Sequence, residues 1–351
     1  MKKNWWKILA VLLIIYSFLV GLLVPLRTGI SDASPASFKA GQEISMQVQG
    51  YNSMYLQSAE ELRAWLKMGD QALAAKNIKV LNDRELQLQF SIPEYLPTNR
   101  KVQAFTLIVD SPEDGAAILP EGIYVTQEKI DSAAAAATWV NADISDLHEK
   151  ASITFPYRNI LYETIRNLYY HVPLWFAMFI LFVSAVVLSI LYLSKFDNKY
   201  DQQAVALTSV GILYGVLGLV TGAIWAKNTW GAYWSWDVKQ NMTAVGLLIY
   251  GAYFVLRASF EDPEKRARIS AVYNIFAFAT LIPLLYVVPK LTDSLHPGAG
   301  GNIAFGSQDL DNTMRMVFYP AIIGWALFGV WVASLVYRSN RIKERLLENE
   351  I

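Results

Sequence analysis

Two histidines and a tryptophan-rich stretch are the parts of this 351-residue chain whose side chains can hold a metal or a flat ligand. His171 directly precedes one long apolar run, and His296 follows another. The stretch 225–237, W-A-K-N-T-W-G-A-Y-W-S-W-D, holds four of the eleven tryptophans. Neutral imidazole is a common metal ligand, and indole rings stack on large planar molecules. The residue types therefore favour a site for a planar, apolar, metal-containing ligand.

Each feature also has a purely structural interpretation. Trp and Tyr collect where a bilayer meets water, so the stretch can be an interfacial belt. A belt needs one or two rings, whereas Trp230, Trp234 and Trp236 crowd together before a terminal acid, Asp237, which we expect to be exposed. A histidine at a helix start can bond a nearby backbone group, and one in a Gly-rich loop can be solvated. We give the third histidine, His148, this structural interpretation.

The metal chemistry open to this chain is narrow. The absence of cysteine excludes disulfides, thiolate metal sites and iron–sulfur clusters. Zinc commonly needs three or four protein ligands, and no third histidine or acid pairs obviously with His171 and His296. Haem iron takes four bonds from its own macrocycle and needs two axial ligands. Two histidines beside aromatic rings therefore fit haem, with Arg315 or Lys290 available to meet its propionates.

Apolar runs position these residues. The chain is 54% hydrophobic, with zero net charge and a mean hydropathy of +0.27, which fits membrane spans plus one sizeable soluble insert. Zero net charge implies no general attraction to nucleic acid. We expect a polytopic all-α membrane protein with six transmembrane helices in contact with membrane lipid. The expected spans are 8–24, 172–194, 202–226, 242–258, 270–289 and 316–337.

The first run is read as an uncleaved span, because it is longer than a signal-peptide core and no Ala-x-Ala follows it. Six spans place both ends of the chain on one side of the membrane. The segments on that side hold thirteen Lys or Arg residues, against four in the loops 227–241 and 290–315. The positive-inside rule then makes both termini cytoplasmic. The insert and both candidate ligands face the periplasm across the inner, cytoplasmic membrane.

A soluble insert separates the first two spans. Apolar and polar residues alternate over 43–49, 85–90 and 104–109, with turn signals between them. This pattern predicts an extracytoplasmic β-sandwich-like domain. An Ala-rich helix is expected at 132–137, and an amphipathic surface helix at 155–170.

We therefore expect three parts in chain order. Residues 1–26 form the first transmembrane helix, and 27–154 form the β-rich insert. Residues 155–351 form a five-helix transmembrane region, whose Trp-rich loop occupies 225–241.

Three strings resemble motifs of a known family. W-G-A-Y-W-S-W-D, residues 230–237, resembles the tryptophan-rich signature of the haem-handling proteins of cytochrome c maturation, CcmC, CcsA and CcmF. Y-Y-H-V-P-L-W at 169–175 and S-L-H-P-G at 294–298 resemble the two histidine motifs of the CcmC (haem exporter protein C) branch. The likeness covers roughly 155–338, and the first span is similar at 8–25.

The resemblance implies a haem-binding membrane protein of cytochrome c biogenesis rather than an enzyme. It implies that His171 and His296 are axial ligands of haem b iron. It also implies a CcmE-like haem chaperone that receives the haem, and CcmA- and CcmB-like ABC transporter subunits that release the loaded chaperone. The residues of the Trp-rich loop expected to contact haem are Trp225, Trp230, Trp234, Trp236 and Asp237.

The insert departs from the family, which joins spans one and two by a short loop where this chain places about 130 residues. We expect the insert to dock a partner or shield the haem, or else to be passive decoration, without supplying a ligand. Two other functions stay open. A CcsA-like haem-ligating synthetase subunit shares the Trp motif but usually has more spans and histidines. A small-molecule transporter is disfavoured, because spans one to five lack ionisable residues in their apolar cores.

Overall fold

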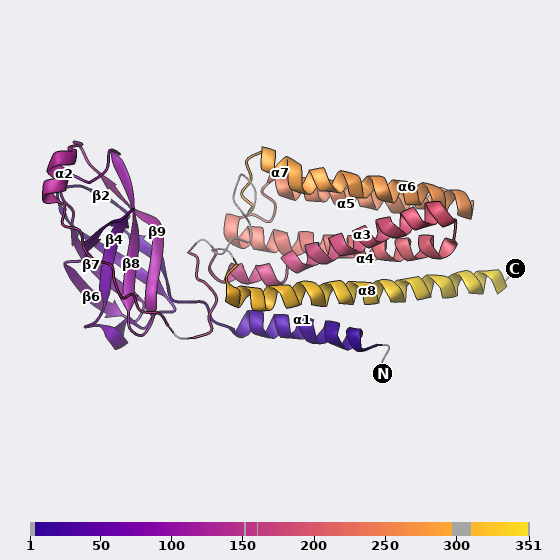
Figure 1. Ribbon diagram of the computed structural model, residues 1–351, viewed down its shortest axis with the longest axis horizontal. Coiled ribbons are helices and arrows are strands. Elements are labelled where there is room, and N and C mark those ends of the chain that lie inside the picture. The colour runs from indigo at the N-terminus through magenta and orange to yellow at the C-terminus, as the bar shows by residue number, and fades with distance from the viewer. Residues whose placement is uncertain (1–3, 151, 160, 297–309, 350–351) are drawn as a thin grey trace. The chain divides into compact units, whose positions relative to one another are not determined.

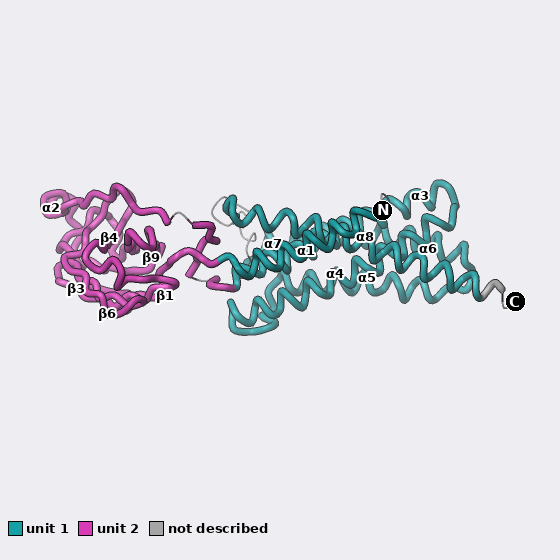
Figure 2. Tube along the Cα trace, turned by 90° about the horizontal axis from the view of Figure 1, so that it is seen from below, with its two compact units in different colours: residues 1–24, 164–351 teal, residues 25–163 magenta. Residues whose placement is uncertain are grey.

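The computed structural model describes residues 4–150, 152–159, 161–296 and 310–349. Pro297 and Gly298 of the second histidine motif lie outside the described residues. The chain divides into two compact units, coloured separately in Figure 2. The first, residues 1–24 and 164–351, is helical, and the second, residues 25–163, is rich in strands. Each unit is described by itself.

Six helical segments in the described part of the chain are long and apolar enough to cross a membrane, which confirms the expected six spans. The protein is therefore a multi-pass membrane protein. The fifth helix, α6, continues through a π-helical turn, η3 (Pro283–Val287), because Pro283 has no backbone N–H for an ordinary helical hydrogen bond. The α-helices of this unit are α1 (Trp5–Leu23), α3 (Val172–Lys195), α4 (Asn198–Trp230), α5 (Val238–Ala258), α6 (Pro263–Ile282), α7 (Val288–Leu291) and α8 (Asn312–Asn349).

Glycines on α4 let side chains of α3 approach its backbone. A Cβ atom at Gly211 would lie 2.4 Å from the ring of Phe182. A Cβ atom at Gly218 would lie 2.7 Å from the ring of Trp175. Real Cβ atoms do not approach other atoms so closely, so only glycine fits at these positions. Glycines three or four residues apart thus allow close contact between α3 and α4.

The helix order brings distant segments to one end of the bundle. The end of α4, the short α7 and the start of α8 gather there, while α1 begins and α8 ends on the other side (Figure 1). At that other side the guanidinium of Arg257 holds the carboxylate of Asp201 through two hydrogen bonds of 2.8 and 2.6 Å. This ion pair joins the start of α4 to the end of α5.

The second unit is a two-sheet sandwich, as the alternating patterns predict. One sheet has the order β1-β3-β7-β6 and the other β2-β9-β8-β4-β5, and side chains from both form one apolar core. Neighbouring strands are antiparallel except β2 and β9. The strands are β1 (Gly29–Ser34), β2 (Ser37–Lys39), β3 (Glu43–Tyr51), β4 (Arg63–Met68), β5 (Gln71–Ala74), β6 (Asn77–Asn82), β7 (Glu85–Ser91), β8 (Val102–Ser111) and β9 (Gly115–Thr126).

Alternation fixes the register of the central strands. Ile44, Met46 and Val48 of β3 are buried, whereas the residues between them face outwards or partly so. In β7, Leu88 lies opposite Met46 and Phe90 lies opposite Ile44. A shift by one residue would turn these apolar side chains to the other face, so the pattern specifies the pairing. The predicted Ala-rich helix is present as α2 (Ser132–Thr138).

The amphipathic helix predicted over 155–170 is wrong in its first half. The described residues of 155–161 form no helix, and a 3₁₀ helix, η2, spans only Tyr162–Tyr169. Phe155 instead forms a parallel bridge with Leu26, accepting a hydrogen bond from the N–H of Arg27. Pro156 follows directly, and its ring disfavours a helical conformation at the residue before it.

Candidate functional site

The first candidate ligand, His171, is the residue immediately before α3, and both of its ring nitrogens are engaged. The indole Nε1 of Trp175 donates to Nε2 of His171 at 3.1 Å. The other ring nitrogen, Nδ1, lies 3.0 Å from the hydroxyl oxygen of Thr221 on α4. That hydroxyl donates to backbone carbonyls one turn earlier in its own helix. His171 is therefore held from two sides, by its own helix and by α4.

The second candidate ligand, His296, lies in an irregular segment after α7. Its ring meets the edges of Trp225 and Trp230, with ring centroids 5.7 and 5.6 Å away. Its backbone N–H donates to the hydroxyl of Ser294 at 3.1 Å. The ring nitrogen Nδ1 is buried and has no hydrogen-bonding partner among the residues that the structure describes. An unsatisfied buried nitrogen of this kind fits a site that accepts a ligand.

The electrostatic surroundings keep His296 neutral. Burial, then the charge of Lys239 and an interaction with His171, lower the pKa of His296 to about 3, against the opposing effect of Asp237. A neutral imidazole keeps the lone pair that a metal requires. Both histidines contact the last turns of α4, His171 through Thr221 and His296 through Trp225, so the two rings lie at the same end of the bundle.

Asp237 ties the Trp-rich loop to the His296 segment. Its carboxylate accepts a hydrogen bond from the N–H of Leu295 at 2.8 Å and from the hydroxyl of Ser294 at 2.9 Å. It also caps the N-terminus of α5 by accepting from the N–H of Lys239. The side chain is only 8% exposed, so the expectation of an exposed acid is wrong. A buried carboxylate persists here because backbone and hydroxyl donors satisfy it.

The four tryptophans of the stretch form two separate edge-to-face pairs. Trp225 and Trp230 lie on the last turns of α4 and pack edge to face, 5.0 Å apart between centroids, beside His296. Trp234 and Trp236 form a second edge-to-face pair, at 6.4 Å, in the loop after Gly231 ends the helix. Trp236 is 78% exposed. Trp225 and Trp230 therefore line His296, whereas in the second pair Trp236 is exposed and Trp234 is half-buried.

The loop that carries Trp234 and Trp236 is held in place by side chains at the start of α5. The side-chain oxygen of Gln240 accepts hydrogen bonds from the N–H and the hydroxyl of Ser235, at 3.0 and 3.1 Å. The side chain of Asn241 donates to the carbonyl of Trp236 at 2.8 Å. Trp236 has a positive φ of 58°, an uncommon conformation for a bulky residue, so these bonds hold an otherwise unfavourable loop.

Several residues of the site were not predicted from the sequence. Trp175 stands in the quoted Y-Y-H-V-P-L-W motif, one helical turn after His171, and that spacing could have identified it. Ser294 likewise stands two residues before His296 in its motif. Thr221 and Gln240 carried no comparable signal, because their contacts depend on how the helices are rotated against their neighbours.

The donor set fits haem better than an ordinary metal ion. The described residues contain no group of three or more His, Asp or Glu side chains that could hold a metal. Two neutral imidazoles with aromatic edges beside them suit a metal whose remaining bonds come from its own planar macrocycle. The predicted propionate partner Arg315 lies at the start of α8, and its Nε is buried without a hydrogen-bonding partner in the described part of the chain.

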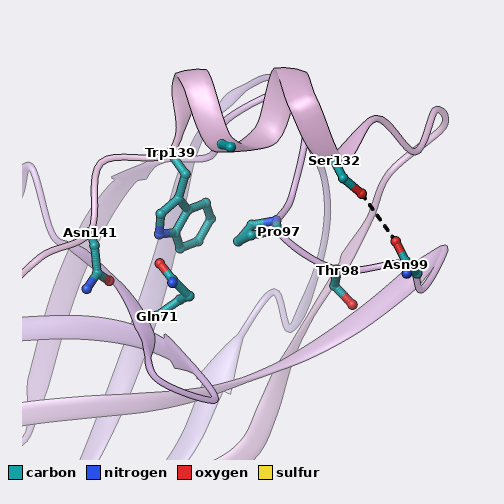
Figure 3. A pocket seen from close by; sticks show the side chains of 8 residues that line it. Gln71, Pro97, Thr98, Asn99, Ser132, Trp139 and Asn141 are labelled. Carbon is teal, nitrogen blue, oxygen red and sulfur yellow. Dashed lines mark hydrogen bonds between the residues drawn. The ribbon is translucent and has the colours of Figure 1, made fainter.

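A separate hollow of about 570 Å³ lies in the β-rich unit beneath α2 (Figure 3). The indole of Trp139 and the ring of Pro97 face it together with neutral amide and hydroxyl side chains. It contains no histidine, so it offers no axial ligand for haem iron. Its lining residues are Gln71, Pro97, Thr98, Asn99, Ser132, Ala136, Trp139 and Asn141.

Fold and site together define a multi-pass membrane protein with a two-histidine site walled by tryptophans. The model of the family described as "Heme exporter protein C" (CcmC) matches residues 133–351, which is more than half of the chain. The chain belongs to this family. The family match includes both histidines, the Trp-rich stretch and Thr221, whereas residues 1–132 lie outside it.

Individual relatives agree with the family match. Heme exporter protein C of Paracoccus denitrificans is 26% identical over 185 residues, which cover 52% of this chain and 76% of the relative. The proteins of the same name from Bradyrhizobium diazoefficiens and Escherichia coli K12 are 26% and 24% identical, covering 69% and 71% of their own lengths. Each alignment spans about half of this chain.

Proposed function

We propose that this protein holds haem b at the periplasmic face of the inner membrane and delivers it to a CcmE-like haem chaperone in cytochrome c biogenesis. One observation carries the proposal: in a chain of the Heme exporter protein C family, two histidines contact the same end of α4. The ring of one of them, His296, lies beside Trp225 and Trp230 and has a buried nitrogen without a hydrogen-bonding partner among the described residues. Haem is the cargo, and its iron accepts one nitrogen from each histidine.

The residues divide this work among them. His171 and His296 supply the axial nitrogens, while Trp225 and Trp230 cover the apolar edge of the cargo and exclude water beside His296. Asp237 holds the His296 segment in place through Ser294 and Leu295. The exposed Trp236 and its half-buried neighbour Trp234 lie where an incoming chaperone can meet the cargo.

The topology and the partners follow from the same proposal. The excess of positive residues at one set of span ends supports a topology with both termini in the cytoplasm and the insert in the periplasm. CcmA- and CcmB-like ABC transporter subunits then drive release of the loaded chaperone. The β-rich insert docks a partner or shields the haem, and it supplies no iron ligand. The protein acts in delivery and not as a catalyst.

An absorption spectrum of the protein purified in detergent tests the proposal. The wild-type protein should show a b-type haem spectrum. His171→Ala and His296→Ala should each lower haem retention and shift the bands, because each removes one axial nitrogen. His148→Ala is the matched control and should change neither, since His148 lies in the β-rich unit. Unchanged spectra in both ligand variants would reject the assignment.

The two alternatives predict different outcomes. A CcsA-like synthetase subunit would attach haem covalently to an apocytochrome without a separate chaperone. A small-molecule transporter would keep its activity after both histidines are replaced. Reconstitution of the purified protein with a CcmE-like chaperone separates these cases, because our proposal requires haem to leave for the chaperone and requires both histidines for it.

A further inference from the structure

A directional chain of hydrogen bonds runs through His171. Indole nitrogen can only donate, so Nε2 of His171 must carry a lone pair where it meets Trp175. In a neutral imidazole the proton then sits on Nδ1, which donates to the hydroxyl of Thr221. The hydroxyl of Thr221 in turn donates to the carbonyl oxygens of Leu217 and Gly218, at 2.9 and 3.0 Å. Each member therefore fixes the direction of the next.

Close packing leaves both rings little room to turn. A Cβ atom at Gly222 would stand 2.8 Å from Cε1 of His171, and one at Gly218 would stand 2.7 Å from the indole of Trp175. The two rings are one helical turn apart on α3, as the two glycines are on α4. Thr221 lies between these glycines in sequence. The same segment of α4 therefore packs against both rings and accepts the hydrogen bond from Nδ1 of His171.

We propose that Thr221 and Trp175 are positioning residues for His171: Thr221 keeps the ring proton on Nδ1 so that Nε2 is the iron ligand, and Trp175 covers Nε2 until the cargo displaces it. This inference rests on the proposed function. A ligating histidine usually donates its other N–H to a fixed acceptor, which sets the tautomer and the ring orientation. Thr221 is that acceptor here.

The indole N–H of Trp175 competes with the haem iron for the lone pair on Nε2 of His171. When His171 binds the cargo it gives up one hydrogen bond, and when the cargo leaves, the indole N–H takes back the same lone pair. This return lowers the affinity for haem and assists release. A protein that hands its cargo on needs such a reversible ligand, whereas a protein that stores haem does not.

The haem-free protein provides the first test. The full chain, labelled with ¹⁵N in its histidine rings, gives signals from three histidines, which His148→Asn and His296→Asn identify by elimination. His171 should show a protonated Nδ1 and an unprotonated, hydrogen-bonded Nε2. Trp175→Phe should move the Nε2 signal towards that of a free ring nitrogen. Thr221→Val should give a mixture of tautomers, and Thr221→Ser should restore the wild-type pattern.

Haem titration of the same variants provides the second test. Trp175→Phe should bind haem roughly 2- to 10-fold more tightly, the equivalent of one net hydrogen bond released from competition. Thr221→Val should bind more weakly, and Thr221→Ser should match the wild type. A protonated Nε2 in the wild-type protein, or weaker binding in Trp175→Phe, would overturn the inference. Either outcome is readable even if Thr221→Val does not fold.

The two proposals fail separately. If His171→Ala binds haem normally, the assignment of His171 as a ligand is wrong, although the ¹⁵N pattern of the haem-free protein is unaffected. If His171→Ala loses haem while the ¹⁵N pattern shows a protonated Nε2, the proposed function stands and the positioning role is rejected.

Discussion

The two histidines of the site are held in opposite ways. His171 stands at the start of a long helix, and both of its nitrogens are engaged by Trp175 and Thr221. His296 stands in an irregular segment, where polar bonds hold its backbone while its ring touches indole edges and keeps an unpartnered Nδ1 within the described structure. One candidate ligand is thus fixed through its ring, and the other through its backbone.

This difference indicates which substitutions should displace each histidine. The position of His171 depends on the packing of α3 against α4, so a change of shape on that interface should affect it most. The position of His296 depends on a few polar bonds to Asp237, so loss of that carboxylate should affect it most. The variants below test this contrast, beginning with the largest expected effect.

Asp237→Ala should release the His296 segment. The change removes the bonds to Ser294 and Leu295 and the cap of α5, which together contribute about 2–4 kcal/mol. We expect haem occupancy to fall at least about tenfold by the same magnitudes, together with a lower thermal unfolding temperature. Asp237→Asn, which keeps one acceptor oxygen, should lie between the two. Normal occupancy in Asp237→Ala would show that His296 is held by other contacts.

Gly222→Ala should disturb His171 in turn. The added methyl group would meet the imidazole at 2.8 Å, and overpacking of this kind destabilises by about 1–3 kcal/mol. Haem affinity should fall several-fold, as measured by titration. Gly251→Ala on α5 is the matched control, because a methyl group there has no neighbour within 4 Å among the described residues and should leave affinity unchanged. If both changes lowered haem affinity equally, packing between α3 and α4 would not be the cause of the loss.

The two tryptophan pairs should separate binding from delivery. Trp225→Ala with Trp230→Ala should lower haem occupancy, because these rings line His296. Trp234→Ala with Trp236→Ala should leave occupancy within about twofold, since Trp236 is largely exposed, Trp234 is only half-buried, and exposed side chains contribute little to stability. Transfer to the chaperone should nevertheless slow. If the change at Trp234 and Trp236 lowers occupancy as strongly as the change at Trp225 and Trp230, all four rings contribute to haem binding.

The third histidine, His148, lies in the β-rich unit, and its replacement should have the smallest effect of these variants. The side chain of His148 and that of Arg63 bond to Asp110, which is fully buried in the β-rich unit. Burial alone would raise the pKa of Asp110, but these hydrogen bonds hold that pKa below its ordinary value. The carboxylate therefore stabilises the unit above pH about 4, and this contribution is lost as the pH falls through the lowered pKa.

Asp110→Asn should make the stability of the unit depend less on acid pH. Thermal unfolding of the full chain, measured between pH 3 and 7, tests this. His148→Ala should lower stability by about 1 kcal/mol, the usual size of one hydrogen bond. Haem occupancy should not change in either variant. Haem loss in His148→Ala would mean that the histidine of the β-rich unit takes part in binding.

Much of the fold could be predicted from hydropathy and alternation. The six spans and the strands β3, β7 and β8 follow from local patterns, because each pattern reports which side of an element is apolar. The region 155–161 could not be predicted in this way. Its pairing with Leu26 joins segments far apart in the sequence, and that contact outweighs the helical pattern.

The candidate site was proposed from its residue types, whereas the hydrogen bonds that hold its residues could not be predicted from the sequence. His171, His296 and the tryptophans are conspicuous as rare residues, whereas the bond between His171 and Thr221 depends on the rotation of two helices about their axes. No local pattern fixes that rotation. Asp237 was expected to be exposed because acids usually are, and its burial becomes visible only once Ser294 and Leu295 are placed against it.

The glycine face of α4 also bears on assembly in the bilayer. A row of small residues on a transmembrane helix is commonly read as a surface for pairing with a helix of another protein. In this chain Phe182, Trp175 and His171 already fill the spaces above Gly211, Gly218 and Gly222. A neighbouring subunit must therefore recognise the bundle through a different face, and mutations of these glycines that disrupt a complex would be acting from inside one subunit.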